Sequence, residues 1–442
     1  MTRGVAQPTD IREVAVIGLG LMGSGIAELI ARSGRRVDAI EINQSLLDQG
    51  LARVRVSLDK AVSRGKLTDA ARDEILARIR PTDDVAAGVA GADLVIEAIP
   101  ERMELKRALF ARLDEACRPD AILATNTSSL SITEIAGGTK YPERVVGLHF
   151  FNPAPVMKLV EVISTVLTSP EIAETLTLLA RDLRKTPIRV DDRAGFVVNA
   201  LLVPYLNHAI RLLETAQATR EDIDKAMTMG LGLPMGPLTL LDLIGLDTDL
   251  AVLETLQDAF GGSRYRPAPL LRKLNDARLL GRKTGRGFYD YQRQSTPADG
   301  DQAPVPAEVA VIPDPDGRLN ELASKIAAAG TAAKAAALAA RIGLDAVISR
   351  DRPGFITEAL AYVQFNDAVR MVQDGYASAA DIDTAMMLGC GYPRGPLQML
   401  DEAGAAKVAS VLEAMHAATG DPAFTPVPML AEYATAGTRF RG

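Results

Sequence analysis

Five short apolar runs divide the first part of the chain. Each run is four to six residues long and stops at glycine or polar residues, which is typical of strands buried in a parallel sheet. Segments with helical spacing separate the runs, the first expected from about Gly23 to Ser33. This alternation predicts an α/β, Rossmann-type doubly wound sheet in domain 1–191, with strands at Glu13–Ile17, Val37–Ile42, Leu94–Ile99, Ile122–Thr125 and Val145–Phe150.

A long charged insertion separates the second predicted strand from the third. It covers about residues 43–80 and carries apolar residues at helical spacing. This pattern predicts a projecting pair of helices.

The pattern changes at Asp192. Strand signals end there, and long segments with a helical apolar period continue to Tyr291. The change of period predicts a first all-α domain over residues 192–291.

The helical part of the sequence is repeated. Residues 192–245 align without gaps on residues 351–404, at an offset of 159, and 24 of 54 positions are identical. Both copies carry DRxGF, [ST]xxDIDxAM, GxGxPxGPL and LDxxG, with Thr219 and Ser378 placed to cap a helix. The repeat predicts a second all-α domain over 351–442, joined by a Pro- and Asp-rich linker over 292–350 that holds an Ala-rich helix at Leu319–Arg341.

Composition narrows the class of protein. The 442 residues are 48% hydrophobic and 24% charged, which is typical of folded globular chains. The net charge is −7, and the basic residues are dispersed, so a nucleic-acid surface is not expected. No apolar run is long enough to span a bilayer, and Cys117 and Cys390 stand far apart without metal-ligand spacing. We therefore expect a cytoplasmic protein without a membrane segment, disulfide framework or metal site.

A glycine-rich turn follows the first predicted strand. A turn of this type, between a strand and a helix, lets pyrophosphate approach the backbone at the helix N-terminus. The six residues of the predicted dinucleotide site are Gly18, Leu19, Gly20, Leu21, Met22 and Gly23.

Glu41 ends the second predicted strand, 18 residues after Gly23. A carboxylate at that place can accept hydrogen bonds from the adenine ribose and repels a 2′-phosphate. The sequence therefore predicts NAD rather than NADP as cofactor.

His149 and Glu161 form the predicted catalytic pair. His149 lies at the carboxyl end of a predicted strand, where open α/β sheets bind their ligands, and histidine exchanges protons near neutral pH. Glu161 interrupts the apolar run LVEVI and needs a polar partner if buried. We expect the carboxylate to fix the imidazole tautomer and stabilise its charged form.

Two further polar residues are site candidates. Asn199 is replaced by Glu358 in the second copy, so the shared helical scaffold does not require an asparagine there. Ser128, in the turn TNTSSL after the fourth strand, can donate a hydrogen bond to a substrate oxygen or can simply cap a helix.

These residues stand in segments that resemble L-3-hydroxyacyl-CoA dehydrogenases, above all the bacterial 3-hydroxybutyryl-CoA dehydrogenases. The resemblance covers about residues 11–291. It rests on the order and spacing of GLGLMGSG, VIEAIPE, TNTSSL, HFFNPAPVMKLVEV, DRAGFVVNALLVPYLNHAI, LPMGPLTLLDLIGLDT and GRKTGRGFYDY.

The resemblance implies reversible NAD-dependent oxidation of short-chain (S)-3-hydroxyacyl-CoA, in fatty acid metabolism and β-oxidation. His149 then acts as general acid and base, Glu161 orients it, and Ser128 and Asn199 bind the C3 oxygen. The insertion corresponds to a helical arm that receives CoA. The remaining implied contacts are Glu101, Lys106, Asn152 and Lys283 for NAD, and Ser57 and Arg64 for CoA.

The second helical copy departs from the short, dimeric family members. Longer members, including the 3-hydroxyadipyl-CoA dehydrogenases of phenylacetate breakdown, also carry two such domains. The chain is therefore expected to be a monomer with an internal pseudo-dimer, or a homodimer. The alternatives to the main interpretation are a 3-hydroxyadipyl-CoA dehydrogenase, a related dehydrogenase of a CoA-free hydroxy acid, and a non-enzymatic NAD-binding protein.

Overall fold

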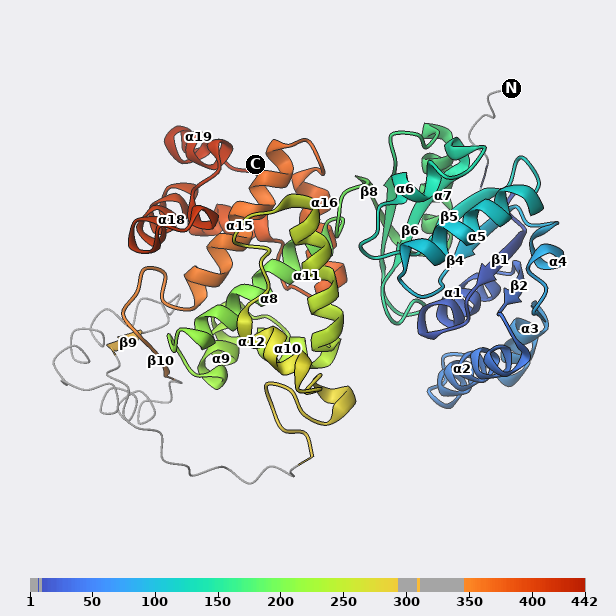
Figure 1. The fold of residues 1–442 in the computed structure, drawn as a ribbon, viewed down its shortest axis with the longest axis horizontal. Coiled ribbons are helices and arrows are strands. Elements are labelled where there is room, and N and C mark those ends of the chain that lie inside the picture. The colour runs from blue at the N-terminus through green and yellow to red at the C-terminus, as the bar shows by residue number, and fades with distance from the viewer. Residues whose placement is uncertain (1–6, 8–9, 293–307, 311–345, 442) are drawn as a thin grey trace. The chain divides into compact units, whose positions relative to one another are not determined.

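The protein folds into two compact units, Met1–Val197 and Val198–Gly442, in the computed structural model of the chain (Figure 1). The structure describes residues 7, 10–292, 308–310 and 346–441. The predicted linker therefore lies mostly outside the described residues, and its Ala-rich helix lies entirely outside them. The helices of both copies fall in the second unit, whereas the first residues of the first copy, 192–197, belong to the first unit. The finer division at 291 and 351 stays a prediction.

The first unit is built on one eight-stranded sheet in the order β3-β2-β1-β4-β5-β6-β7-β8. Strands β1 to β6 run parallel, β7 is antiparallel to β6, and β8 is parallel to β7. The Rossmann-type sheet is confirmed, with strands at Glu13–Ile17 (β1), Arg36–Ile40 (β2), Ile79–Thr82 (β3), Leu94–Glu97 (β4), Ile122–Thr125 (β5), Val145–Phe150 (β6), Leu159–Ser164 (β7) and Thr186–Asp191 (β8).

Helices cover this sheet and form the predicted insertion. The insertion folds as two helices, α2 and α3, which begin at side-chain caps from Asn43 and Thr68. Helix α2 packs against α1 as well as α3. The helices of the first unit are α1 (Leu21–Arg32), α2 (Gln44–Ser63), α3 (Asp69–Ala77), α4 (Val85–Val89), α5 (Met103–Ala116), α6 (Ile132–Ala136) and α7 (Pro170–Asp182).

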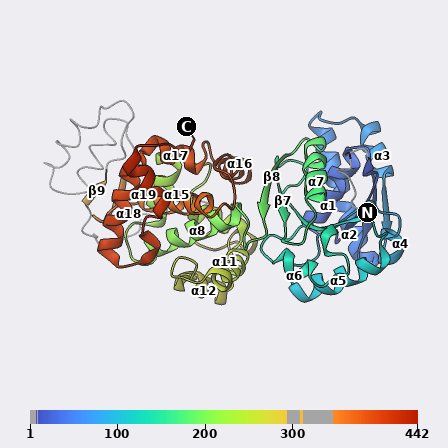
Figure 2. The same cartoon turned by 90° about the horizontal axis from the view of Figure 1, so that it is seen from above.

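The second unit contains the same five-helix sequence twice, and each second-copy helix matches its counterpart at the offset of 159 residues. Helices α8 and α15 of the two copies pack against each other (Figure 2). The first copy consists of α8 (Val198–Glu214), α9 (Arg220–Gly230), α10 (Pro237–Ile244), α11 (Leu246–Phe260) and α12 (Pro269–Asp276). The second consists of α15 (Thr357–Gln373), α16 (Ala379–Cys390), α17 (Pro396–Ala403), α18 (Ala405–Thr419) and α19 (Pro428–Ala436).

A buried aspartate explains the spacing of two repeated motifs. Asp224 accepts hydrogen bonds from the backbone N–H groups of Leu238 and Thr239, at the start of α10. A Cβ added to Gly236 would lie 2.3 Å from the Asp224 side chain. Asp383 makes the matching bonds to α17. Each copy therefore needs both the aspartate and the glycine, because the aspartate caps the next helix at close range.

Candidate active site

The glycine turn has the geometry expected of a phosphate-binding loop. Gly18 adopts φ +88°, which favours glycine, and a Cβ on Gly23 would lie 1.7 Å from the carbonyl oxygen of Gly18. Gly20, at the N-cap of α1, has no atom within 4 Å of its Cβ position. The first and third glycines thus serve the tight turn and the packing, whereas the second leaves space beside the helix N-terminus.

Glu41 is held at the same turn. Its Oε1 accepts a hydrogen bond of 2.7 Å from the backbone N–H of Leu19, and its Oε2 accepts one of 3.1 Å from Ile42. The carboxylate is therefore positioned beside the glycine turn, where a ribose of a bound dinucleotide would lie.

A buried ion-pair network lies at the ends of β4 and β5. The ammonium of Lys106 is 2.6 Å from Glu97 Oε1 and 3.4 Å from Glu101 Oε2, and both Lys106 and Glu97 are buried. Glu101 in turn accepts hydrogen bonds from the hydroxyl of Thr127 and the backbone N–H of Ser128. This network fixes the turn that carries Ser128.

At Glu101, burial shifts the pKa in one direction, and the nearby charge and hydrogen bonds shift it in the other. Burial alone would raise its pKa, but the ammonium of Lys106 and the hydrogen bonds from Thr127 and Ser128 hold that pKa below its usual value. Glu101 is therefore ionised at neutral pH. The structure places Lys106 inside this network, and the NAD contacts implied for Glu101 and Lys106 stay predictions.

His149 and Glu161 are brought together by strand register. They are directly opposite each other in the antiparallel β6–β7 pair, and His149 Nδ1 lies 2.6 Å from Glu161 Oε2. The second oxygen of Glu161 accepts a hydrogen bond of 3.1 Å from the backbone N–H of Val197. Because Glu161 is buried and its carboxylate accepts the proton on Nδ1, the imidazole keeps Nε2 for proton exchange.

Aromatic rings and the following loop surround His149. The rings of Phe151 and Phe196 lie 4.6 and 5.7 Å from the imidazole, measured between centroids. Asn152 follows Phe151 in this loop, is exposed, and precedes Pro153 through a cis peptide bond.

Lys185, which no sequence motif indicates, supports the same loop. Lys185 is buried, and its ammonium donates hydrogen bonds to the carbonyl oxygens of Ala154 (2.6 Å) and Met157 (2.7 Å). Burial, with a contribution from the charge of Lys158, lowers the pKa of Lys185 to about 8. No local signal separated this lysine from an ordinary charge at the end of a helix.

We expect Lys185→Met to lower kcat/KM by roughly 10- to 100-fold, because the loop after His149 loses two hydrogen bonds that fix its position. Steady-state assays with NADH measure the effect. Lys158→Met, at an exposed neighbour, is the matched control and should change kcat/KM by less than about twofold. Equal losses in both variants would contradict a positioning role for Lys185.

The remaining candidates lie on other elements. Ser57 is half-buried on α2, and Arg64 is exposed where α2 ends. Asn199 lies in the first turn of α8, and Lys283 forms an ion pair with Asp247; both belong to the second unit. The roles given to these four residues stay predictions.

Two other structural findings bear on the class of protein. Within the described parts of the chain, no helix is both long enough and apolar enough to cross a membrane. In the same residues, no group of three or more His, Cys, Asp or Glu side chains is arranged to hold a metal ion.

Comparison with protein families gives two matches that cover most of the chain. Residues 13–193 match the NAD binding domain of 3-hydroxyacyl-CoA dehydrogenase. Residues 195–291 and 354–441 match the C-terminal domain of the same enzyme, so that domain is matched by both helical copies.

Individual relatives extend this result. A 3-hydroxyadipyl-CoA dehydrogenase of Escherichia coli K12 is 38% identical, with 96% of this chain and 98% of the relative aligned. A 3-hydroxybutyryl-CoA dehydrogenase of Clostridioides difficile is 47% identical over 64% of this chain and its own full length. Among solved structures, a 3-hydroxybutyryl-CoA dehydrogenase from E. coli K12 has a TM-score of 0.85 at 37% identity, covering 96% of this chain and 98% of that one.

Proposed function

The chain belongs to the 3-hydroxyacyl-CoA dehydrogenase family and is an NAD-dependent oxidoreductase; on this premise we propose that it oxidises (S)-3-hydroxybutyryl-CoA reversibly to acetoacetyl-CoA. The observation that carries the proposal is the His149–Glu161 pair. His149 lies near the carboxyl end of β6, and the glycine turn follows the carboxyl end of β1 in the same sheet. A non-enzymatic role would leave a buried carboxylate beside a histidine without use.

His149 performs the proton transfer. With Nδ1 held by Glu161, Nε2 accepts the proton of the substrate's C3 hydroxyl during oxidation and returns it to the forming alkoxide during reduction. Glu161 stabilises the imidazolium that exists between the two steps. Ser128 and Asn199 donate hydrogen bonds to the C3 oxygen, so that its developing charge is stabilised without a metal ion.

The first unit has a binding place suited to NAD. The open space at Gly20 lies at the N-terminus of α1, where backbone N–H groups bind pyrophosphate, and Glu41 stands beside it for the ribose hydroxyls. NAD, when bound, supplies the hydride acceptor. Glu101, Lys106, Asn152 and Lys283 orient it, while Ser57 and Arg64 on the α2 side bind CoA.

A second candidate substrate is 3-hydroxyadipyl-CoA. It is favoured by one observation: the E. coli relative of that name aligns over nearly the whole chain, second helical copy included. The C. difficile relative, in contrast, aligns over its own full length with only 64% of this chain.

The test follows NADH absorbance with acetoacetyl-CoA, longer 3-ketoacyl-CoAs, 3-oxoadipyl-CoA and free acetoacetate. We expect the highest kcat/KM with acetoacetyl-CoA. A preference for 3-oxoadipyl-CoA would favour the second candidate, and activity with free acetoacetate alone would contradict a CoA substrate.

We also propose that the chain is a monomer in which the second helical copy takes the place of a partner subunit. Several contacts join the copies: the amide of Gln217 donates to the carbonyl of Phe355 at 2.5 Å, and Ser263 donates to Asp421 at 2.5 Å. Arg264 forms a buried ion pair with Asp367. Light scattering should give the mass of one chain, and dimers built through residues 192–291 of both chains would contradict the proposal.

We expect Asp367→Ala to lower the free energy of unfolding by about 3 kcal/mol, because Arg264 keeps its buried charge without the carboxylate. Stacking of Arg264 on the ring of Tyr265 limits the loss. Urea denaturation followed by circular dichroism measures it. Asp374→Ala, an exposed change at the end of α15, is the control, and an equal effect there would show that the ion pair contributes nothing specific.

A further inference from the structure

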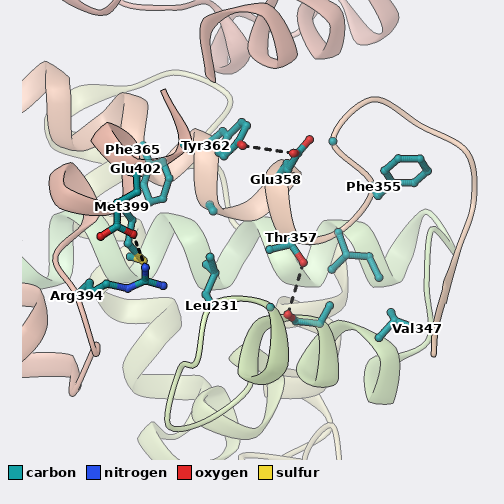
Figure 3. Close-up of a pocket in the computed structure, with 16 residues that line it drawn as sticks. Leu231, Val347, Phe355, Thr357, Glu358, Tyr362, Phe365, Arg394, Met399 and Glu402 are labelled. Atoms are coloured by element: carbon teal, nitrogen blue, oxygen red, sulfur yellow. Dashed lines mark hydrogen bonds and ion pairs between the residues drawn. The ribbon is translucent and has the colours of Figure 1, made fainter. Parts of the chain in front are cut away.

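The second unit contains a cavity of about 430 Å³ that the proposed reaction does not use (Figure 3). A cavity of this size is in the range of small-molecule sites. Its walls come from α15 and α17 of the second copy, and from the end of α9 of the first. The residues that define it in Figure 3 are Leu231, Val347, Phe355, Tyr362, Phe365 and Met399.

One second-copy residue at the cavity, Phe355, has a counterpart in the first copy that lies next to the catalytic pair. Phe355 matches Phe196, whose ring lies 5.7 Å from that of His149. Both phenylalanines adopt φ +46°, a costly backbone conformation for a residue with a Cβ. Phe355 is 39% exposed and lines the cavity. The second copy therefore keeps the strained backbone turn and its phenylalanine. It does so although the proposed site residue Asn199 is replaced there by Glu358.

Several lining positions differ in size between the copies. Ala361 and Ala403 stand where the first copy has Leu202 and Ile244, which opens space. Tyr362 and Phe365 replace smaller side chains and give the cavity aromatic surface. The cavity lining is therefore mostly apolar, and its second-copy side chains differ in size from those at the matching positions of the first copy.

The charged groups at the cavity are already paired. Arg394 forms an ion pair with Glu402, and Lys407 binds Glu358 Oε1 at 2.6 Å, where the hydroxyl of Tyr362 also donates at 3.3 Å. Each of the two lining carboxylates thus has one cation as its partner, Arg394 for Glu402 and Lys407 for Glu358. A ligand that buries a further negative charge there would find both cations already engaged, whereas an uncharged aliphatic chain needs no such partner.

We propose that this cavity is a second ligand site, which binds the acyl chain of a medium-chain acyl thioester. The apolar and aromatic lining holds the hydrocarbon, and the uncharged thioester head leaves both ion pairs intact. The choice of an acyl chain rests on the proposed function. The existence of the site rests on the cavity and on the retained turn at Phe355.

The absence of tryptophan from the sequence makes a specific test possible. Phe355→Trp places the sole indole at the cavity. We expect octanoyl-CoA, whose phosphates lie at the far end of the pantetheine arm, and the uncharged octanoyl-N-acetylcysteamine to change its emission in a saturable way. Octanoate should bind at least tenfold more weakly than octanoyl-N-acetylcysteamine. No saturable change with either thioester would overturn the proposal, and octanoate binding as tightly as the thioesters would overturn the uncharged-head requirement.

A cavity-filling variant is the matched control. Ala361→Leu with Ala403→Ile introduces the side chains that the first copy carries at these positions, and leaves the proposed catalytic residues unchanged. In the Phe355→Trp background it should abolish the emission change and keep kcat/KM within twofold. Persistence of the signal would mean that it comes from elsewhere, and would overturn the proposal.

Calorimetry gives a readout that needs no tryptophan. Octanoyl-CoA should bind the unmodified chain at two sites and the filled variant at one. If the proposed dehydrogenase site does not bind the thioester, the counts become one and zero. If the second site does not exist, the unmodified chain and the filled variant would bind the same number of octanoyl-CoA molecules. That result is distinguishable from failure of the proposed function, in which the two proteins still differ by one site.

Discussion

His149→Gln should retain NADH binding and lose roughly 10³-fold in kcat, because general acid–base catalysis by a positioned histidine contributes on the order of 10² to 10⁴. The imidazole lies on β6 and is buried against Glu161, whereas the glycine turn proposed for the dinucleotide follows β1. Turnover is measured with saturating acetoacetyl-CoA, and binding by the fluorescence of NADH itself.

Two further variants make this result specific. Glu161→Gln keeps the side-chain shape, but its amide can donate to Nδ1 and so favours the wrong imidazole tautomer; kcat should fall strongly with NADH binding unchanged. His416→Gln changes a half-buried histidine that contacts the carbonyl of Asp421 at 2.9 Å, and should leave kcat within twofold. Near-normal turnover in His149→Gln would overturn the assignment.

The free energy of unfolding of Asp249→Val should increase relative to that of the unmodified chain as the pH rises, by about 4 kcal/mol between pH 5 and pH 8. Asp249 is 1% exposed on α11, and neither carboxylate oxygen has a hydrogen-bond partner in the described part of the chain. Burial raises its pKa to about 8. Val408, at the same position of the second copy, is fully buried, so the helical scaffold accommodates valine there.

The sign follows from proton uptake. The folded-state pKa of Asp249 lies above the unfolded value of about 3.9, so folding takes up a proton between those two pH values. The native state therefore loses about 1.4 kcal/mol per pH unit as the pH rises through that window, and the valine variant does not. Urea denaturation across the window measures the difference. Asp258→Val, on an exposed position of the same helix, should leave the slope unchanged, and a parallel slope in Asp249→Val would refute the prediction.

The elements with strong local patterns were predictable from the sequence. β1, β5 and β6 have the predicted limits because their apolar runs are continuous and buried. β3 and β8 were missed, since their residues alternate between buried and exposed or include proline at the sheet edge. Their assignment needs the neighbouring strand, which local periodicity does not supply.

For the candidate site, the sequence predicted the roles of individual residues better than the contacts between the elements that carry them. His149 and Glu161 were paired because a buried carboxylate needs a partner, but the antiparallel register that pairs them was not visible in the spacing. Lys106 lies on a helix whose charges resemble a solvated face, and its partner Glu97 comes from a different element. Such buried ion pairs form only when distant segments meet, so the sequence of either segment alone does not indicate them.

The ion pair between Arg264 and Asp367 distinguishes this chain from a symmetric pair of identical subunits. The first-copy residue that matches Asp367 is His208, and burial lowers its pKa to about 4, so it carries no charge at neutral pH. Two identical first copies would offer Arg264 a neutral imidazole in place of a carboxylate. The interface between the two copies is therefore asymmetric in charge, with a cation on the first copy and an anion on the second.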